Sequence, residues 1–140
     1  MKLSNRTANG AALVVALLAS LAATMPSEAA CFARGRLLFS GTGPWTVLME
    51  TVSGQACQQG ILSDGTPQDG IIAPSESGRF KSLHAISEPG NGRLDLFQGG
   101  RFAYTSKAGY SGRDQFTLRL CQFYQAGERC TLAAVYVTVR

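Results

Sequence analysis

Hydrophobic and polar residues alternate with a period of two along the chain after residue 30. No window in this region has the apolar residues at i, i+3, i+4 and i+7 that mark an amphipathic helix. Short apolar runs are separated by clusters of Gly, Pro, Asn and Ser, as is typical of strands joined by turns. The pattern predicts seven strands: Arg36–Phe39, Thr46–Val52, Phe80–Ile86, Arg93–Gln98, Arg101–Thr105, Gln115–Phe123 and Cys130–Val139.

A long polar stretch, Gly54–Gly78, separates the second predicted strand from the third. Its Asp-Gly and Pro-Ser groups favour turns, although the pair Ile71-Ile72 suggests one further short strand. About seven short strands in a domain of this size are typical of an antiparallel β-sandwich. We therefore expect an all-β fold, with Gly54–Gly78 as its main loop.

Two hairpins are expected from turn residues and alternation. Gly99-Gly100, between Gln98 and Arg101, is typical of a two-residue turn, because glycine accepts positive φ angles. In the last hairpin, a loop over Tyr124–Gly127 places Phe123 opposite Glu128. The facing pairs on one side are then Phe116 with Val135, Leu118 with Ala133 and Leu120 with Thr131.

Four cysteines, Cys31, Cys57, Cys121 and Cys130, permit three disulfide pairings. The hairpin register sets Cys121 opposite Cys130, within reach of a disulfide, and this leaves Cys31 with Cys57. A chain-entropy argument gives about 3 kcal/mol for the first bridge and about 3.5 kcal/mol for the second. A metal or redox site is the alternative, but no Cys-x-x-Cys spacing occurs and His84 is the only histidine.

The first residues have the features of an export signal. Lys2 and Arg6 precede the apolar run Ala11–Met25, and small residues at Ser27 and Ala29 suit cleavage after Ala29. We therefore expect a signal peptide over residues 1–29 and one domain over residues 30–140, secreted or periplasmic.

Two alternatives to a cleaved signal peptide remain. The apolar run is shorter than the roughly 20 residues that span a bilayer, which argues against an uncleaved membrane anchor. A lipoprotein signal would acylate Cys31, but Glu28 stands where an aliphatic residue is needed, and three cysteines would be left.

The charge of the chain is mildly positive, with 13 basic and 9 acidic residues. Removal of Lys2, Arg6 and Glu28 leaves 11 basic and 8 acidic residues, a formal charge of +3. The arginines are scattered, which argues against a nucleic-acid partner. Mild basicity suits adhesion to anionic envelope polymers, although an ordinary solvated surface explains it equally.

Nothing in the chain nominates a catalytic set. His84 lies alone on a predicted strand, and no Gly-x-Ser-x-Gly motif occurs. Asp64 and Asp69 share a Gly-rich loop, but the dense oxygen spacing of a calcium loop is absent, which favours turns. We expect no catalytic residue, no metal and no cofactor.

The segment from Pro89 to Val139 resembles the bacterial immunoglobulin-like and cadherin-like domains. Its matching motifs are Pro-x-Asn-Gly-x-Leu from Pro89 and Phe-x-Tyr-Thr followed by Gly-Tyr-x-Gly-x-Asp-x-Phe-Thr between Phe102 and Thr117. A Val-x-Val strand ends the match, which covers about half of the predicted domain. Ser106, where the family usually has Pro, and Cys121-Gln122-Phe123, where calcium-associated members often carry Asp-Gly, depart from the pattern and weaken any expectation of calcium binding.

The resemblance implies structural roles for five residues. Gly109 and Gly112 permit a tight corner between strands, and Tyr110 fills the edge of the sandwich. Asp114 accepts hydrogen bonds from loop amides, and Phe116 begins the buried face. These residues are not expected to form an active site.

We therefore expect an immunoglobulin-like, non-enzymatic binding or interaction module with no permanent membrane span. Its partner would be a protein or an envelope polymer, bound through Gly54–Gly78 and adjoining loops, because binding residues concentrate on loops held by a rigid scaffold. The alternatives are a small secreted enzyme or inhibitor acting on envelope polymers or peptides, and a purely structural envelope protein.

Overall fold

The computed structural model describes residues 31–41, 43–68 and 70–140. These residues form nine strands and no helix, so the predicted all-β class is confirmed. The predicted signal peptide and its cleavage site lie outside the described residues. The strands are β1 (Phe32–Arg36), β2 (Trp45–Thr51), β3 (Ala56–Leu62), β4 (Ile71–Ile72), β5 (Phe80–Ser87), β6 (Gly92–Phe97), β7 (Arg101–Ser106), β8 (Gly112–Tyr124) and β9 (Gly127–Val139).

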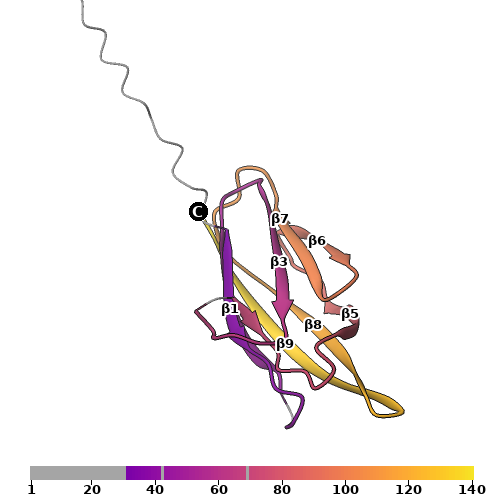
Figure 1. The fold of residues 1–140 in the computed structure, drawn as a ribbon. Helices are drawn as coiled ribbons and strands as arrows, with labels where there is room; N and C mark the ends of the chain where they lie inside the picture. The colour runs from indigo at the N-terminus through magenta and orange to yellow at the C-terminus, as the bar shows by residue number, and fades with distance from the viewer. Residues whose placement is uncertain (1–30, 42, 69) are drawn as a thin grey trace, which may run out of the picture.

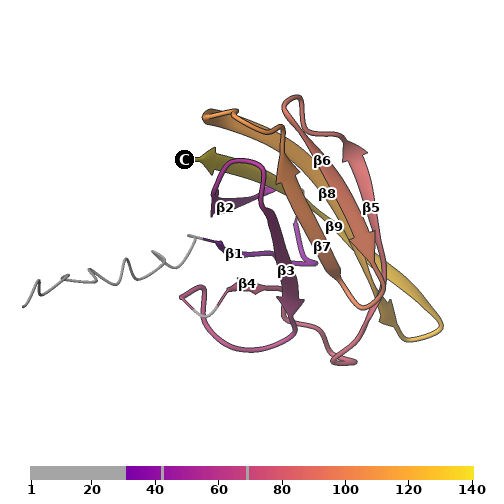
Figure 2. The same ribbon diagram turned by 90° about the horizontal axis from the view of Figure 1, so that it is seen from above.

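All nine strands belong to one mixed sheet, in the order β5-β8-β9-β2-β1-β4-β3-β7-β6. The sheet curls until its two end strands, β5 and β6, contact each other, which makes it nearly barrel-shaped (Figures 1 and 2). The expectation of about seven strands, all antiparallel, is wrong. Three pairings are parallel: β2 with β9, β1 with β4 and β3 with β4.

Two strands differ from their predicted positions because their buried faces carry small or polar residues. The first strand is Phe32–Arg36 and not Arg36–Phe39, since Ala33 and Gly35 are too small to mark an inward face. Within Gly54–Gly78, β3 buries Cys57 and Ile61 but has Gln59 between them. This polar interruption hides the alternation, whereas the short strand Ile71–Ile72 is found as expected.

The two predicted hairpins have different outcomes. The last strand pair of the first hairpin is Phe97 with Arg101, so its loop has three residues and not two. The β8–β9 hairpin has the predicted register throughout, including Cys121 opposite Cys130 and Phe123 opposite Glu128. This long hairpin extends beyond the rest of the molecule in both views (Figures 1 and 2).

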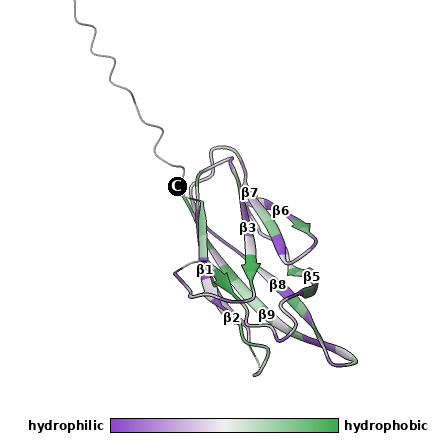
Figure 3. Ribbon diagram, in the orientation of Figure 1, coloured by the Kyte–Doolittle hydropathy of each residue, from purple (hydrophilic) through white to green (hydrophobic). Residues whose placement is uncertain are grey.

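The core is centred on three aromatic rings. Phe116 stacks on Tyr104 at a centroid distance of 5.9 Å and meets the edge of Phe102 at 5.8 Å. All three side chains are fully buried. Hydrophobic and hydrophilic residues are mixed along the strands (Figure 3), because each strand has one inward and one outward side.

Both disulfides have the predicted partners. Cys31 bonds Cys57 with a Cα–Cα distance of 5.3 Å, and Cys121 bonds Cys130 across the hairpin at 4.0 Å. Two disulfides indicate an oxidising, extracytoplasmic environment. Acylation of Cys31 would require a free thiol, which this disulfide removes. Within the described ranges, no helix is long and apolar enough to cross a membrane.

Candidate functional site

A groove of about 640 Å³ lies on the outward face of β1, β2, β9 and β8. The strand register places two neighbouring rows of outward residues across these four strands. One row is Phe32, Glu50, Thr138 and Arg113, and the other is Arg34, Leu48, Tyr136 and Gln115. We call the hollow lined by these eight residues the outer groove.

The floor of the outer groove carries large apolar side chains that are partly exposed to solvent. Phe32, Leu48 and Tyr136 are 43%, 45% and 47% exposed, respectively. They lie on three adjacent strands, so their exposed surfaces adjoin. Clustered apolar side chains bordered by polar ones are typical of a contact surface for another molecule.

Two arginines lie at opposite corners of the outer groove, on its outermost strands. In the described part of the chain, the side chains of Arg34 and Arg113 have neither an ion-pair nor a hydrogen-bond partner. The carboxylate of Glu50 is occupied, because it pairs with Arg140 at 2.7 Å. The groove therefore offers two guanidinium groups that are free to donate hydrogen bonds.

The second carboxylate at this groove, Asp114, is occupied on its inner side. One oxygen accepts the backbone N–H of Gly90 and of Gln115, each at 2.9 Å. The other accepts the N–H of Asn91 at 2.9 Å and the hydroxyl of Tyr104 at 2.8 Å. The expected contacts with loop amides are confirmed, and the bond to Tyr104 is an addition that the sequence did not indicate.

This arrangement raises the pKa of the Tyr104 hydroxyl. Burial raises the pKa of Tyr104 well above its usual value, and the hydrogen bond and negative charge of Asp114 raise it further. Tyr104 therefore remains a neutral donor to Asp114 over the physiological pH range.

The other residues of the resemblance motif also have structural positions. Gly109 and Gly112 have φ angles of 78° and 140°, which suit the corner between β7 and β8. Tyr110 packs against the core and donates its hydroxyl to the carbonyl of Arg113. Ser106, at the position where the family usually has Pro, accepts the backbone N–H of Gly54 at 2.9 Å.

His84 is exposed on β5 and lies opposite Arg119 of β8. Among the described residues it has no hydrogen-bond or ion-pair partner. No base or carboxylate orients its ring, so the geometry does not nominate it as a catalytic group.

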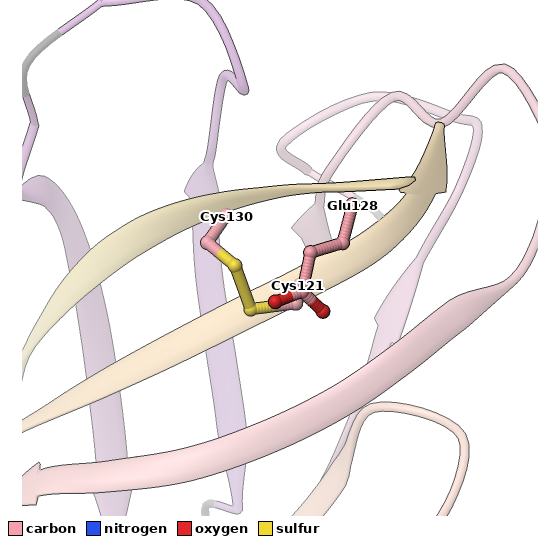
Figure 4. A group of neighbouring side chains, drawn as sticks. All are labelled: Cys121, Glu128 and Cys130. Atoms are coloured by element: carbon pink, nitrogen blue, oxygen red, sulfur yellow. A yellow bond between two sulfur atoms is a disulfide. The ribbon is translucent and has the colours of Figure 1, made fainter. Parts of the chain in front are cut away.

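One cluster at the hairpin has the ligand types of a metal site: Cys121, Glu128 and Cys130, whose ligand atoms lie within 4.8 Å of one another (Figure 4). Both sulfur atoms are bonded to each other, so the thiolates that a metal needs are not free. Lys81 pairs with Glu128 at 2.9 Å and lowers the pKa of that carboxyl. With its disulfide formed, the cluster cross-links the two strands of the hairpin.

The predicted loop Gly54–Gly78 is partly strand, and only some of it borders a hollow. Gln59, Gln68 and Gly70 line a second cavity of about 440 Å³, which shares Phe32 and Arg34 with the outer groove. Asp64 is exposed, and Asp69 lies outside the described residues.

Sequence reasoning missed the outer groove. Its eight residues come from four strands spread over residues 32–138, and β1 was placed too far along the chain. The available signal was an apolar residue at an outward strand position, as at Leu48 and Tyr136. Leu48 was hidden in the apolar run Val47-Leu48-Met49.

No protein-family model matches the chain, and a search of curated proteins finds no similar sequence.

Proposed function

We propose that the protein is an exported, non-enzymatic binding module of immunoglobulin-like type, and that its ligand occupies the outer groove. The observation that carries this proposal is the apolar floor of Phe32, Leu48 and Tyr136 between two arginines without partners. An apolar hollow with a few convergent polar groups is the usual form of a ligand site.

The occupied carboxylates favour binding over catalysis. Glu50 is paired with Arg140, and Asp114 accepts four hydrogen bonds. A general acid or base needs a carboxyl group that can exchange a proton with a substrate, and neither of these two is free to do so.

The assignment to an exported immunoglobulin-like module has separate support. Two disulfides suit an oxidising compartment. The positive φ angles of Gly109 and Gly112, the loop amides bound by Asp114 and the burial of Phe116 support the structural roles that we expect for these residues.

A photo-crosslinking amino acid tests the site in the native host. We expect adducts when it replaces Leu48 in the outer groove, and none when it replaces Ile86, an exposed apolar residue of β5. Equal labelling from both positions, or none from Leu48, would contradict a ligand in the groove. An enzymatic turnover that disappears in Glu50→Gln would contradict the non-enzymatic role.

The protruding β8–β9 hairpin favours a second candidate, an inhibitor of an envelope or secreted enzyme. Its tip is closed by a disulfide and carries Phe123, which is exposed, and Tyr124, whose ring lies 3.6 Å from the guanidinium carbon of Arg129. A rigid projecting hairpin can enter a partner's cleft without losing much conformational entropy. Adducts from Phe123 but not from Leu48 would favour this candidate.

A further inference from the structure

We propose that the outer groove binds an acidic polysaccharide, whose carboxylates pair with Arg34 and Arg113 and whose sugar rings lie on Leu48 and Tyr136. The inference rests on the proposed binding function and names the ligand class of the same site.

The two unpaired arginines of the groove favour an anion. Arg34 and Arg113 have no side-chain partners in the described chain, whereas Glu50 pairs with Arg140 and Asp114 accepts four hydrogen bonds on its inner side. A guanidinium group forms paired, charge-assisted hydrogen bonds with a carboxylate. A carboxylated ligand would satisfy both arginines, whereas a neutral one would leave them hydrated at the groove corners.

The positions of the two arginines suit an oligomer. Arg34 is on β1 and Arg113 on β8, with β2 and β9 between them. Three strand spacings separate these backbones by about 14 Å. An oligomer with repeated carboxylates can meet both guanidinium groups while it lies across the strands, over Leu48 and Tyr136.

The sheet beneath the groove disfavours an extended peptide. Leu48 pairs with Arg34 on one side and Tyr136 on the other, and Tyr136 pairs with Leu48 and Gln115. The backbone groups of β2 and β9 are occupied on both sides, so a peptide cannot add a strand over the floor of the groove, which is the usual mode of recognising an extended chain on a sheet.

Over β2 and β9, the outer groove therefore offers a ligand only side chains. The polar ends of Gln115, Tyr136 and Thr138 have no partners among the described residues. They can bond to sugar hydroxyls, while the apolar face of a sugar ring packs on the exposed side of Tyr136, whose ring is amphipathic.

A second copy of the chain is also disfavoured as the occupant. A two-fold dimer would place the same patch on both sides of the interface. Such a dimer would gather four guanidinium groups, those of Arg34 and Arg113 of each copy, in one interface, and this concentration of like charge opposes association.

The test is calorimetric titration of the purified protein with oligogalacturonate, with its carboxyl-reduced neutral counterpart as the matched control ligand. We expect the acidic oligomer to bind and the neutral one to bind at least about tenfold more weakly. Arg34→Gln and Arg113→Gln should each weaken binding about tenfold, whereas Arg79→Gln, which removes the same charge from an exposed site outside the groove, should not.

Tyr136 separates stacking from charge. Tyr136→Ala should weaken binding about tenfold without changing its dependence on salt, whereas the arginine variants should reduce that dependence. Circular dichroism of each variant checks that the fold is retained.

Four results would overturn the inference. Equal weakening by Arg79→Gln would indicate diffuse attraction, and preference for sulfated dextran over oligogalacturonate would exclude the carboxylate assignment. Binding of an acidic peptide but not of oligogalacturonate would exclude a polysaccharide, while adducts from Leu48 would still support a binding module. Absence of both adducts and binding would contradict the proposed function as well.

Discussion

Asp114 connects three separate parts of the chain through one side chain. Its oxygens hold the backbone of Gly90 and Asn91 before β6, the hydroxyl of Tyr104 on β7, and the N–H of Gln115 on β8. The Asp-x-Phe motif predicted the loop bonds, because they follow from the local habit of Asp in turns. The Tyr104 bond depends on how β7 lies against the start of β8, which local sequence does not specify.

Asp114→Asn should therefore lower the free energy of unfolding by about 3 kcal/mol, because two half-buried donors, the N–H of Asn91 and the hydroxyl of Tyr104, lose a charged acceptor. Urea unfolding measures the loss. Asp95→Asn is the matched control, since Asp95 makes only an exposed pair with Arg93 and should cost about 0.5 kcal/mol or less. Equal costs would contradict a special role for Asp114.

The raised pKa of Tyr104 predicts that the protein loses stability at alkaline pH. Its folded pKa is raised, so the unfolded state releases this proton first. The contribution is complete below the ordinary tyrosine pKa of about 10 and is lost as the pH rises above it. From neutral to alkaline pH, the melting temperature should fall less steeply in Tyr104→Phe than in the parent protein. Parallel curves would exclude Tyr104 as the cause.

Single strands were predictable where large apolar residues mark one face. In β8, Phe116, Leu118 and Leu120 are all buried, and its register with β9 followed from alternation. In β1 and β3 the inward positions include Ala33, Gly35 and Gln59, so the same rule gave a shifted strand and a missed one. Packing with neighbouring strands, and not intrinsic preference, determines these two elements.

One ion pair fastens β5 to the hairpin. Lys81 lowers the pKa of Glu128 through a hydrogen bond and its charge, so the pair contributes above the ordinary glutamate pKa and is lost as the pH falls through the lowered value. Lys81→Gln should move the Glu128 titration, followed by carboxyl NMR shifts, upward. Lys107→Gln should leave the Glu128 titration unchanged, because the ammonium group of Lys107 contacts the carbonyl of Gly90 instead. An unmoved titration in Lys81→Gln would exclude the pair.

At the scale of the whole molecule, class and disulfides were predictable but topology was not. Alternation indicates strands and their faces, whereas no turn or spacing marks the parallel pairing of Trp45–Thr51 with Ala133–Val139. The outer groove depends on that pairing, because it brings Leu48 beside Tyr136. The location of the candidate site could therefore not be predicted from the sequence, although its residue types could be read there.

The two disulfides should stabilise the molecule by similar amounts at different places. Cys31→Ala with Cys57→Ala should lower the free energy of unfolding by about 3.5 kcal/mol, and Cys121→Ala with Cys130→Ala by about 3 kcal/mol. Urea unfolding of both variants under oxidising conditions measures this. The parent protein treated with a thiol reductant should lose stability as well, and an unchanged midpoint after full reduction would contradict both values.

The last strand of the chain lies in the interior of the sheet, between β8 and β2. Until β9 is in place, β2 has only one of its two neighbouring strands and the core lacks Val135 and Val137. Folding must then wait for the C-terminal segment, so the chain stays threadable throughout passage and folds late, in a single step governed by distant contacts. For the export that we propose, such a topology would keep the chain unfolded until residues 127–139 have crossed the membrane.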